Sequence, residues 1–363
     1  MKYKKLLHLG ISVLLLGSIL TGCRGLSSLI IGSDISVSNN KSSEKVLNVF
    51  NWSEYLPDSV IKDFEAKYNI KVNYITYSSN EEMLAKIMAG DDIYDISVAS
   101  DYMVDVMRKQ KIIEPINMNN VPNFKNIGAQ FKNLSFDPGN KYSVPYMWGD
   151  AVIAVNKSLV KWDITSYSDL WDSRLRKSLV VLDDERAIIG IALKKLGYSI
   201  NETDPAKLEQ AKEQLLLLKG NIKAFNSDSP KTELLKGDAT VGFLWGAEAA
   251  LAEKQNKDIK TFFPKEGMYI WQDNFVIPKG ANHKENAELF INYILDPQVS
   301  AKISKEFPYA NPNAAAHQYI DGSTLKNTTI YPSENDMKIG ERLRDLEDAT
   351  KLYDKIWAEV KSK

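Results

Sequence analysis

The stretch V-L-N-V-F-N-W-S-E-Y, from Val46 to Tyr55, passes from an apolar run into an aromatic and acidic one. Its first five residues form the kind of short apolar run that buried parallel strands use. Pro57 and the helically spaced apolar residues of 60–68 then predict a helix. The sequence therefore places a tryptophan, a glutamate and a tyrosine where a buried strand gives way to a helix.

The alternation of strand and helix continues beyond this stretch. Apolar runs predict strands at 71–77 and 94–99, and a helix capped by Asn80 is expected between them. Ser100 and Asp101 are expected to cap a further helix. The succession strand-helix-strand-helix-strand is typical of a parallel sheet covered by helices.

A second set of elements of similar build follows in the middle of the chain. We expect strands at 178–182 and 240–244 and helices at 188–196 and 206–219. Later come a strand at 269–278, an amphipathic helix at 284–294 and a long final helix at 342–360. A body of roughly 320 residues also exceeds what one hydrophobic core usually serves. The sequence therefore predicts an α/β protein with two lobes.

The first 22 residues have the pattern of an export signal. Lysines precede an apolar run at 6–20, which is shorter than the roughly 20 residues that span a bilayer, and this favours a cleaved signal. The run ends in L-T-G-C at Cys23 and resembles a bacterial lipoprotein signal, in which that cysteine is lipidated. The alternative is an incidental thiol. Residues 23–44 are rich in serine and lack aromatic residues, so we expect a flexible tether.

Charge and cysteine content exclude several classes of protein. Removal of the three signal lysines from the 46 basic residues leaves 43 against 47 acidic residues, a net charge of about −4. This balance lacks the basic excess of nucleic-acid-binding proteins. Cys23 is the only cysteine in the chain, so the folded part has no disulfide, no cysteine-based metal site and no catalytic cysteine.

Motifs of catalysis are also missing from the sequence. His283 and His317 lie in polar surroundings, and no G-x-S-x-G, Walker or H-E-x-x-H motif is present. Asp183 and Asp184 are adjacent, and neighbouring residues at a strand end rarely point together as a glycosidase pair must. We therefore expect no enzyme, no metal and no cofactor.

Polar and aromatic side chains gather at five places in or directly after the expected strands. In open α/β sheets, ligands bind outside the carboxyl ends of the strands, because loops and helix N-termini converge there. None of the five places contains a lysine or an arginine. The rule selects residues 52–55, 100–102, 183–185, 245–248 and 271–273.

This composition suits a ligand with ammonium groups and a hydrocarbon spacer. A desolvated cation needs an acid as its partner, and an aromatic face adds roughly 0.5 to 2 kcal/mol while covering methylene groups. Taken singly, a tryptophan after a strand is more often a packing residue, and an aspartate that begins a helix is more often a cap. Their coincidence at five strand ends is what indicates a binding site.

At these residues the chain resembles the substrate-binding proteins of bacterial polyamine ABC transporters, the spermidine/putrescine-preferring PotD type. The likeness covers nearly the whole mature body and includes the strings V-L-N-V-F-N-W-S-E-Y, Y-S-V-P-Y-M-W-G, A-F-N-S-D, F-P-K-E-G, W-Q-D and Y-A-N-P-N-A-A-A. The resemblance implies the type II periplasmic-binding-protein fold, in which two α/β lobes joined by crossing segments close over the ligand.

The resemblance also implies a set of ligand-binding residues. Acids of this set would pair with ammonium groups, and its aromatic residues would sandwich the methylene chain. The positions that match the family motifs are Trp52, Ser53, Glu54, Tyr55, Ser100, Tyr102, Asp184, Trp245, Trp271, Asp273 and Tyr309.

Two positions depart from the family pattern. The family has a second acid three positions after the aspartate that aligns with Asp184, and here this position is Ala187. A polar family residue near the C-terminus aligns loosely with Leu343. The loss of a carboxylate puts the preferred polyamine in doubt, and Glu185, Asp101 and Glu248 are the acids that could compensate.

The resemblance predicts a lipid-anchored, extracytoplasmic receptor that captures spermidine or putrescine and delivers it to the permease of an ABC importer. The protein is expected to act as a monomer. Alternatives are another organic cation or an amino-acid-like solute as ligand, or a surface lipoprotein that acts as a sensor or interaction module. The expected division is a first lobe of 45–150 and 274–320 and a second lobe of 151–273 and 321–363, after the signal at 1–22 and the tether at 23–44.

Overall fold

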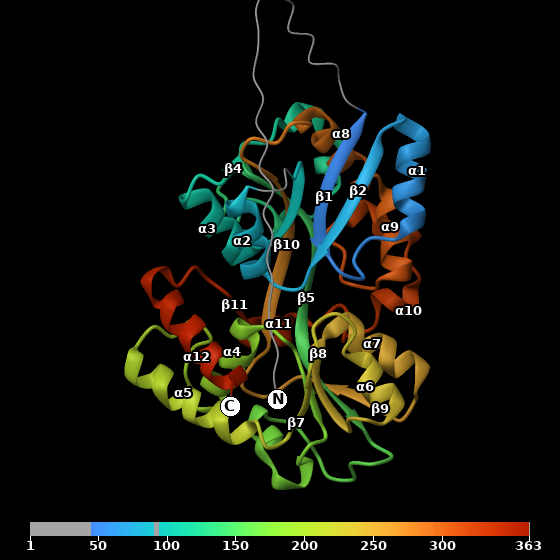
Figure 1. The fold of residues 1–363 in the computed structure, drawn as a ribbon. Helices are drawn as coiled ribbons and strands as arrows, with labels where there is room; N and C mark the ends of the chain where they lie inside the picture. The colour runs from blue at the N-terminus through green and yellow to red at the C-terminus, as the bar shows by residue number, and fades with distance from the viewer. Residues whose placement is uncertain (1–44, 91–93, 363) are drawn as a thin grey trace, which may run out of the picture. The chain divides into compact units, whose positions relative to one another are not determined.

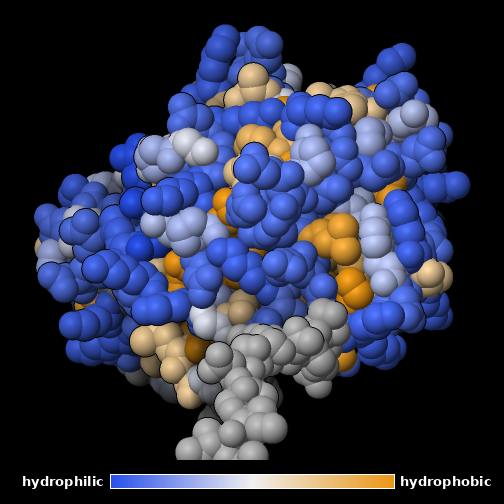
Figure 2. All heavy atoms as spheres, turned by 90° about the horizontal axis from the view of Figure 1, so that it is seen from above, coloured by the Kyte–Doolittle hydropathy of each residue, from blue (hydrophilic) through white to orange (hydrophobic). Residues whose placement is uncertain are grey.

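The computed structural model describes residues 45–90 and 94–362. The expected signal and the whole of the expected tether, Cys23 included, lie outside the described residues. Within the described ranges, no helix combines the length and the apolarity that crossing a membrane requires. The face of the molecule seen from above is mainly hydrophilic, with small and separate apolar areas (Figure 2), as is usual for a surface in contact with water.

An 11-stranded sheet of mixed direction runs through the described chain, with the main strand order β2-β1-β3-β10-β5-β8-β6-β7. Strands β4 and β11 pair with β10, and β9 pairs with β5. The strands are β1 (Val46–Trp52), β2 (Lys71–Tyr77), β3 (Ile96–Ser100), β4 (Ile113–Glu114), β5 (Ser143–Asn156), β6 (Leu179–Val181), β7 (Ile222–Phe225), β8 (Val241–Trp245), β9 (Ile259–Phe262), β10 (Tyr269–Pro278) and β11 (Glu341–Arg342).

Two long strands, β5 and β10, connect the two ends of this sheet (Figure 1). Residues 143–151 of β5 pair antiparallel with β10, and residues 151–156 pair with β8 and β9. Residues 273–276 of β10 pair with β3. We call the part built on β1, β2 and β3 lobe 1 and the part built on β6, β7 and β8 lobe 2.

Helices cover both faces of each lobe (Figure 1). In lobe 1, helices α1, α8 and α9 lie on one face and α2 and α3 on the other; in lobe 2, α4, α5 and α12 lie on one face and α6 and α7 on the other. The helices are α1 (Asp58–Tyr68), α2 (Asn80–Ala89), α3 (Asp101–Lys109), α4 (Glu185–Lys195), α5 (Pro205–Leu218), α6 (Lys231–Lys236), α7 (Gly246–Gln255), α8 (Lys284–Ile294), α9 (Pro297–Glu306), α10 (Gly322–Leu325), α11 (Glu334–Ile339) and α12 (Thr350–Ser362).

The expected strands at 71–77 and 269–278 and the expected helix at 284–294 have the bounds found for β2, β10 and α8. The cap of α2 is Ser79 rather than Asn80, since the Ser79 hydroxyl accepts a hydrogen bond from the backbone N–H of Glu82 at 3.1 Å. Asn80 is the first residue of the helix instead, and its amide contacts Ser100.

The prediction of one long helix at 342–360 is wrong. Arg342 pairs with Ile270 in the parallel bridge between β11 and β10, and helix α12 begins only at Thr350. The Arg342 guanidinium also donates to the Asp101 carboxylate at 3.0 Å, an ion pair between α3 and β11. These tertiary contacts hold residues 341–342 in extended form despite their helical pattern.

Strand β5 is the longest strand described, and it was not predicted as an element. Pro145, Gly149 and Asp150 interrupt its apolar run, and such residues usually argue against a central strand. The pairing of β5 with β10 has a bulge, because the consecutive residues Asp273 and Asn274 pair with Met147 and Pro145, which are two positions apart. A bulge is one of the places in a sheet where proline is tolerated.

Candidate ligand-binding site

A pocket of about 490 Å³, part of it open to solvent, lies where the ends of the strands of both lobes meet. Nine of the eleven sequence-predicted residues line it: Trp52, Ser53, Tyr55, Ser100, Asp184, Trp245, Trp271, Asp273 and Tyr309. The structure thus brings together residues that are up to 257 positions apart in the sequence.

Asp273 is the most completely coordinated acid of this pocket. Its two carboxylate oxygens accept hydrogen bonds from the Tyr55 hydroxyl and the Ser100 hydroxyl, each at 2.7 Å. Tyr55 follows β1 and Ser100 ends β3, so both donors come from lobe 1. Burial raises the pKa of Asp273 to about 7, although both hydrogen bonds act to lower it. The protein therefore holds in place a carboxylate that has no cationic partner among the described residues.

Asp184 and Asp228 are the other carboxylates of the pocket. Asp184 caps α4 by accepting a hydrogen bond from the backbone N–H of Ala187 at 2.8 Å, and burial raises its pKa. Burial also raises the pKa of Asp228, and the charge of Glu54 adds to this effect. The capping role of Asp184 and its place in the pocket are thus compatible.

The residues that line the pocket include three carboxylates and, within the described chain, no lysine or arginine. An anion would find no basic partner among them. A cation would gain charge pairing and would at the same time relieve the cost of holding acids out of water.

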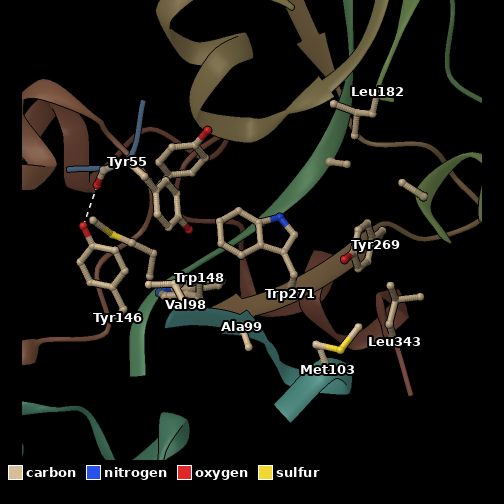
Figure 3. Close-up of a cluster of buried hydrophobic side chains, with 14 of the residues drawn as sticks. Tyr55, Val98, Ala99, Met103, Tyr146, Trp148, Leu182, Tyr269, Trp271 and Leu343 are labelled. Atoms are coloured by element: carbon tan, nitrogen blue, oxygen red, sulfur yellow. Dashed lines mark hydrogen bonds between the residues drawn. The ribbon is translucent and has the colours of Figure 1, made fainter. Parts of the chain in front are cut away.

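The side chain of Trp271 lies at the centre of the site, between Tyr55 and Tyr269 (Figure 3). Its indole N–H donates to the backbone carbonyl of Asp150 at 3.2 Å, which fixes the plane of the ring. Gly149 lies opposite Trp271 on β5, and a Cβ atom at Gly149 would come within 2.7 Å of the indole ring. The absence of a side chain there allows the ring to lie flat across the strand.

Three further aromatic rings, those of Trp245, Tyr309 and Tyr55, lie next to one another beside the Trp271 ring. The Trp271 ring centroid lies 6.0 Å from that of Trp245 and 5.6 Å from that of Tyr309. The ring centroids of Tyr309 and Tyr55 lie 4.8 Å apart. All three contacts are edge-to-face, so the four rings form one contiguous aromatic lining of the pocket, called the aromatic trough below, and such a surface suits a hydrocarbon chain.

Glu54 and Tyr102 do not line the pocket, unlike the other nine predicted residues. Glu54 has a positive φ of 48°, and its carboxylate accepts from the Lys231 ammonium at 2.9 Å. The Tyr102 hydroxyl donates to the Glu81 carboxylate at 2.8 Å, on the side of α3 that faces α2. The family motif identifies both positions, whereas tertiary contacts direct their side chains to other partners.

Five lining residues were missed in the sequence analysis: Ser78, Asn80, Ser227, Asp228 and Tyr269. The rule of strand ends would have found most of them, because Ser78 and Asn80 follow β2, and Ser227 and Asp228 follow β7. The sequence pattern of Ile222–Phe225 does not predict the strand β7, so Ser227 and Asp228 are not expected at a strand end.

The two departures from the family pattern share one location. Ala187 and Leu343 both line a small separate cavity of about 190 Å³ beside Tyr269 and Arg186. Of the acids considered as replacements, Asp101 pairs with Arg342, and Glu248 pairs with Lys231. Glu185 is buried, and burial raises its pKa to about 8. None of these three acids lines the main pocket.

No group of three or more histidine, cysteine, aspartate or glutamate residues in the described ranges has an arrangement suited to a metal ion. His283 instead contacts the Asp95 carboxylate through Nδ1 at 3.0 Å, and His317 contacts the backbone carbonyl of Asn311. Both histidines thus have structural partners.

Comparison with known proteins gives consistent results. The family model described as bacterial extracellular solute-binding protein matches residues 59–331. The spermidine/putrescine-binding periplasmic protein of Salmonella typhimurium is 38% identical over 323 residues, which cover 88% of this chain and 93% of that protein. Solute binding, not catalysis, characterises these proteins.

Solved structures agree with the sequence comparison. A Listeria monocytogenes protein assigned to a spermidine/putrescine ABC transporter superposes with a TM-score of 0.85, at 33% identity, over 87% of this chain and 99% of that chain. The TpPotD lipoprotein of Treponema pallidum gives a TM-score of 0.77, at 33% identity, over the same shares. These matches confirm the predicted two-lobed α/β fold. The chain therefore belongs to the bacterial extracellular solute-binding proteins, in the PotD-type branch of spermidine/putrescine ABC transporter receptors, an extracytoplasmic and non-enzymatic family.

Proposed function

We propose that this protein is the lipid-anchored receptor of an ABC importer and that it captures a polyamine, spermidine or putrescine, in the pocket between the lobes. The observation that carries the proposal is a pocket, partly open to solvent, with three carboxylates, an aromatic trough and no basic residue among the described residues that line it. Relatives named for spermidine and putrescine binding support the same ligand class.

In the proposed complex, Asp273 and Asp184 pair with ammonium groups, and the rings of Trp271, Trp245 and Tyr309 cover the methylene chain. Asp273 is held by donors from lobe 1, whereas Asp184 and Trp245 belong to lobe 2. A ligand that contacts both sets of residues favours the closed arrangement of the lobes, by no more than its differential affinity for that arrangement. The closed receptor then delivers the ligand to a permease.

The lipid anchor on Cys23 is part of the proposal. The L-T-G-C motif and the serine-rich residues after it support it, and so does the similarity to a Treponema pallidum lipoprotein. Metabolic labelling with an azido fatty acid tests it. Label is expected on the wild-type protein and not on Cys23→Ser, and equal labelling of both would contradict the anchor.

A panel of ligands tests the proposed specificity. We expect heat of binding in titration calorimetry with at least one of putrescine, spermidine, spermine and cadaverine, at a Kd in the micromolar range or tighter, about −8 kcal/mol. Simple amino acids are expected to give no heat, because their carboxylates would meet the acids of the pocket. Absence of heat and of a thermal shift with every polyamine would contradict the proposal.

Polyamine affinity is expected to depend on pH through Asp273. The pKa of this buried acid is raised to about 7, so below that pH a proton must leave before an ammonium can pair with the carboxylate. Lowering the pH from 8 to 6 should therefore weaken binding roughly 10-fold, and binding at pH 6 should release about one proton. Titration in buffers of different ionisation enthalpy measures this release.

The empty protein should show the opposite trend. A raised pKa in the folded state means that the unfolded chain loses this proton at lower pH, so the Asp273 contribution to stability falls as pH rises from about 4 to 7.

A polyamine affinity that does not change between pH 6 and pH 8 would show that Asp273 does not pair with the ligand.

A further inference from the structure

Lys231, the first residue of α6, is surrounded by carboxylates of both lobes. Its ammonium lies 2.9 Å from the Glu54 carboxylate and 2.9 Å from each oxygen of the Glu248 carboxylate. The Ser229 hydroxyl accepts a further hydrogen bond at 3.0 Å. The Lys231 side chain is 13% exposed and that of Glu248 only 3%, whereas that of Glu54 is 42% exposed, so the ammonium joins one buried carboxylate to one that solvent reaches.

The cluster adjoins the binding pocket. Glu54 is flanked in sequence by the pocket residues Ser53 and Tyr55, and Glu248 lies three residues after Trp245, in the first turn of α7. Burial raises the pKa of Tyr309, another pocket residue, and the charges of Glu248, Asp273 and Glu54 add to this effect, so the cluster and Tyr309 are within electrostatic range of each other.

Glu54 and Glu248 would form a good receptor for a ligand ammonium if Lys231 were absent. With Lys231 in place, its ammonium takes that position. The lysine is attached to the protein, so it competes with free ligand at a high effective concentration. Displacing it would also require a new partner for the displaced ammonium, or would leave it without one at substantial cost.

We propose that Lys231 is a specificity-determining residue, a built-in ammonium that occupies the Glu54–Glu248 carboxylates and so restricts the ligand to the acids of the remaining pocket. This inference rests on the polyamine-binding function proposed above. A diamine needs partners for two ammonium groups and finds them in the buried carboxylates of Asp184 and Asp273, whereas Asp228 is exposed to solvent. A longer polyamine carries an additional ammonium, for which the Glu54 and Glu248 carboxylates are already taken by Lys231.

The substitution Lys231→Met in the full chain tests the proposal. Methionine keeps much of the apolar stem and frees both carboxylates. We expect the spermidine Kd to fall at least 10-fold in titration calorimetry, while the putrescine Kd changes less than 3-fold. Lys212→Met is the matched control, because Lys212 is 16% exposed and pairs with Glu209 and Glu359, none of which lines the pocket. It should leave the ratio of the two affinities unchanged.

Freeing the buried Glu248 carboxylate could unfold the single variant, so the double variant Lys231→Met, Glu248→Gln provides a second measurement. It removes the buried charge and still frees Glu54, and the spermidine Kd should again fall relative to that of putrescine. An unchanged ratio in both variants would overturn the proposal. An equal loss of affinity for both ligands would also overturn it, because Lys231 would then only tie the lobes together.

The failure of this inference is distinguishable from that of the proposed function. If the wild-type protein binds no polyamine, the proposed function fails and this inference falls with it. If the wild-type protein binds polyamines and Lys231→Met leaves their relative affinities unchanged, the proposed function stands and only the role of Lys231 is refuted.

Discussion

Replacement of Asp273 by asparagine is expected to weaken polyamine binding at least 100-fold at pH 8, about 3 kcal/mol. The reason is that the variant removes the charge of a carboxylate that the Tyr55 and Ser100 hydroxyls hold in position. A desolvated ammonium without an acid partner costs several kcal/mol, and loss of one member of a buried pair typically costs about 3–5 kcal/mol. Titration calorimetry with putrescine and spermidine measures the effect.

The control for this variant is Asp183→Asn. Asp183 lies on the same strand-to-helix connection as Asp184 but is 41% exposed and pairs with Lys361, outside the pocket. We expect its affinity to change less than 2-fold. Since ionised Asp273 is unfavourable in the empty protein at pH 8, Asp273→Asn should not lower the melting temperature without ligand. Near-wild-type affinity of this variant would refute the assignment of Asp273.

Truncation of Trp271 to alanine is expected to weaken binding roughly 50-fold, about 2–3 kcal/mol. A cation–π contact contributes roughly 0.5 to 2 kcal/mol, and each covered methylene adds about 0.8 kcal/mol. The ring lies against Gly149, which has no side chain that could replace the lost aromatic surface. Trp271→Phe keeps an aromatic face and should lose much less.

The truncation also creates a cavity, and such changes in cores cost about 3–5 kcal/mol of stability. Binding must therefore be measured below the onset of unfolding, with circular dichroism as a check. Trp162→Ala is the control, because Trp162 packs against Arg174 away from the pocket. If both tryptophan variants bind equally well, Trp271 is a packing residue and not a wall of the site.

Local sequence was sufficient for elements with clear apolar runs or a clear apolar face. The strand 269–278 has an apolar run on each side of its three central polar residues and ends at Pro278, and the helix 284–294 has one apolar face, so both were predicted with the bounds found in the structure. The rule of strand ends selected pocket-lining residues at the ends of β1, β3, β6 and β8, whereas Trp271 and Asp273 line the pocket from inside β10. The direction of a strand decides at which edge of the sheet the residues after it lie. This direction follows from the order of strands and helices along the chain.

Strand β5 and the segment 341–349 were decided by tertiary contacts. Pro145 and Gly149 are poor strand residues, yet β5 is held by pairing with β10 on one side and β8 and β9 on the other. Arg342 has a helical context, yet pairing with Ile270 and the ion pair with Asp101 keep it extended. Local preferences differ by about 1 kcal/mol per residue, which a few such contacts outweigh.

The sequence by itself determined the α/β class, the family and the positions of most pocket residues, because these depend on periodic patterns and on motifs that are local in the chain. Only the tertiary structure decided the direction in which each side chain points and the charges that surround it. Glu54 shows the difference. Its motif marks it as a ligand partner, but in the structure its carboxylate pairs with the ammonium of Lys231, 177 positions later in the chain. Electrostatic pairing depends on distance in space, and distance in space between residues so far apart in sequence is set by the fold.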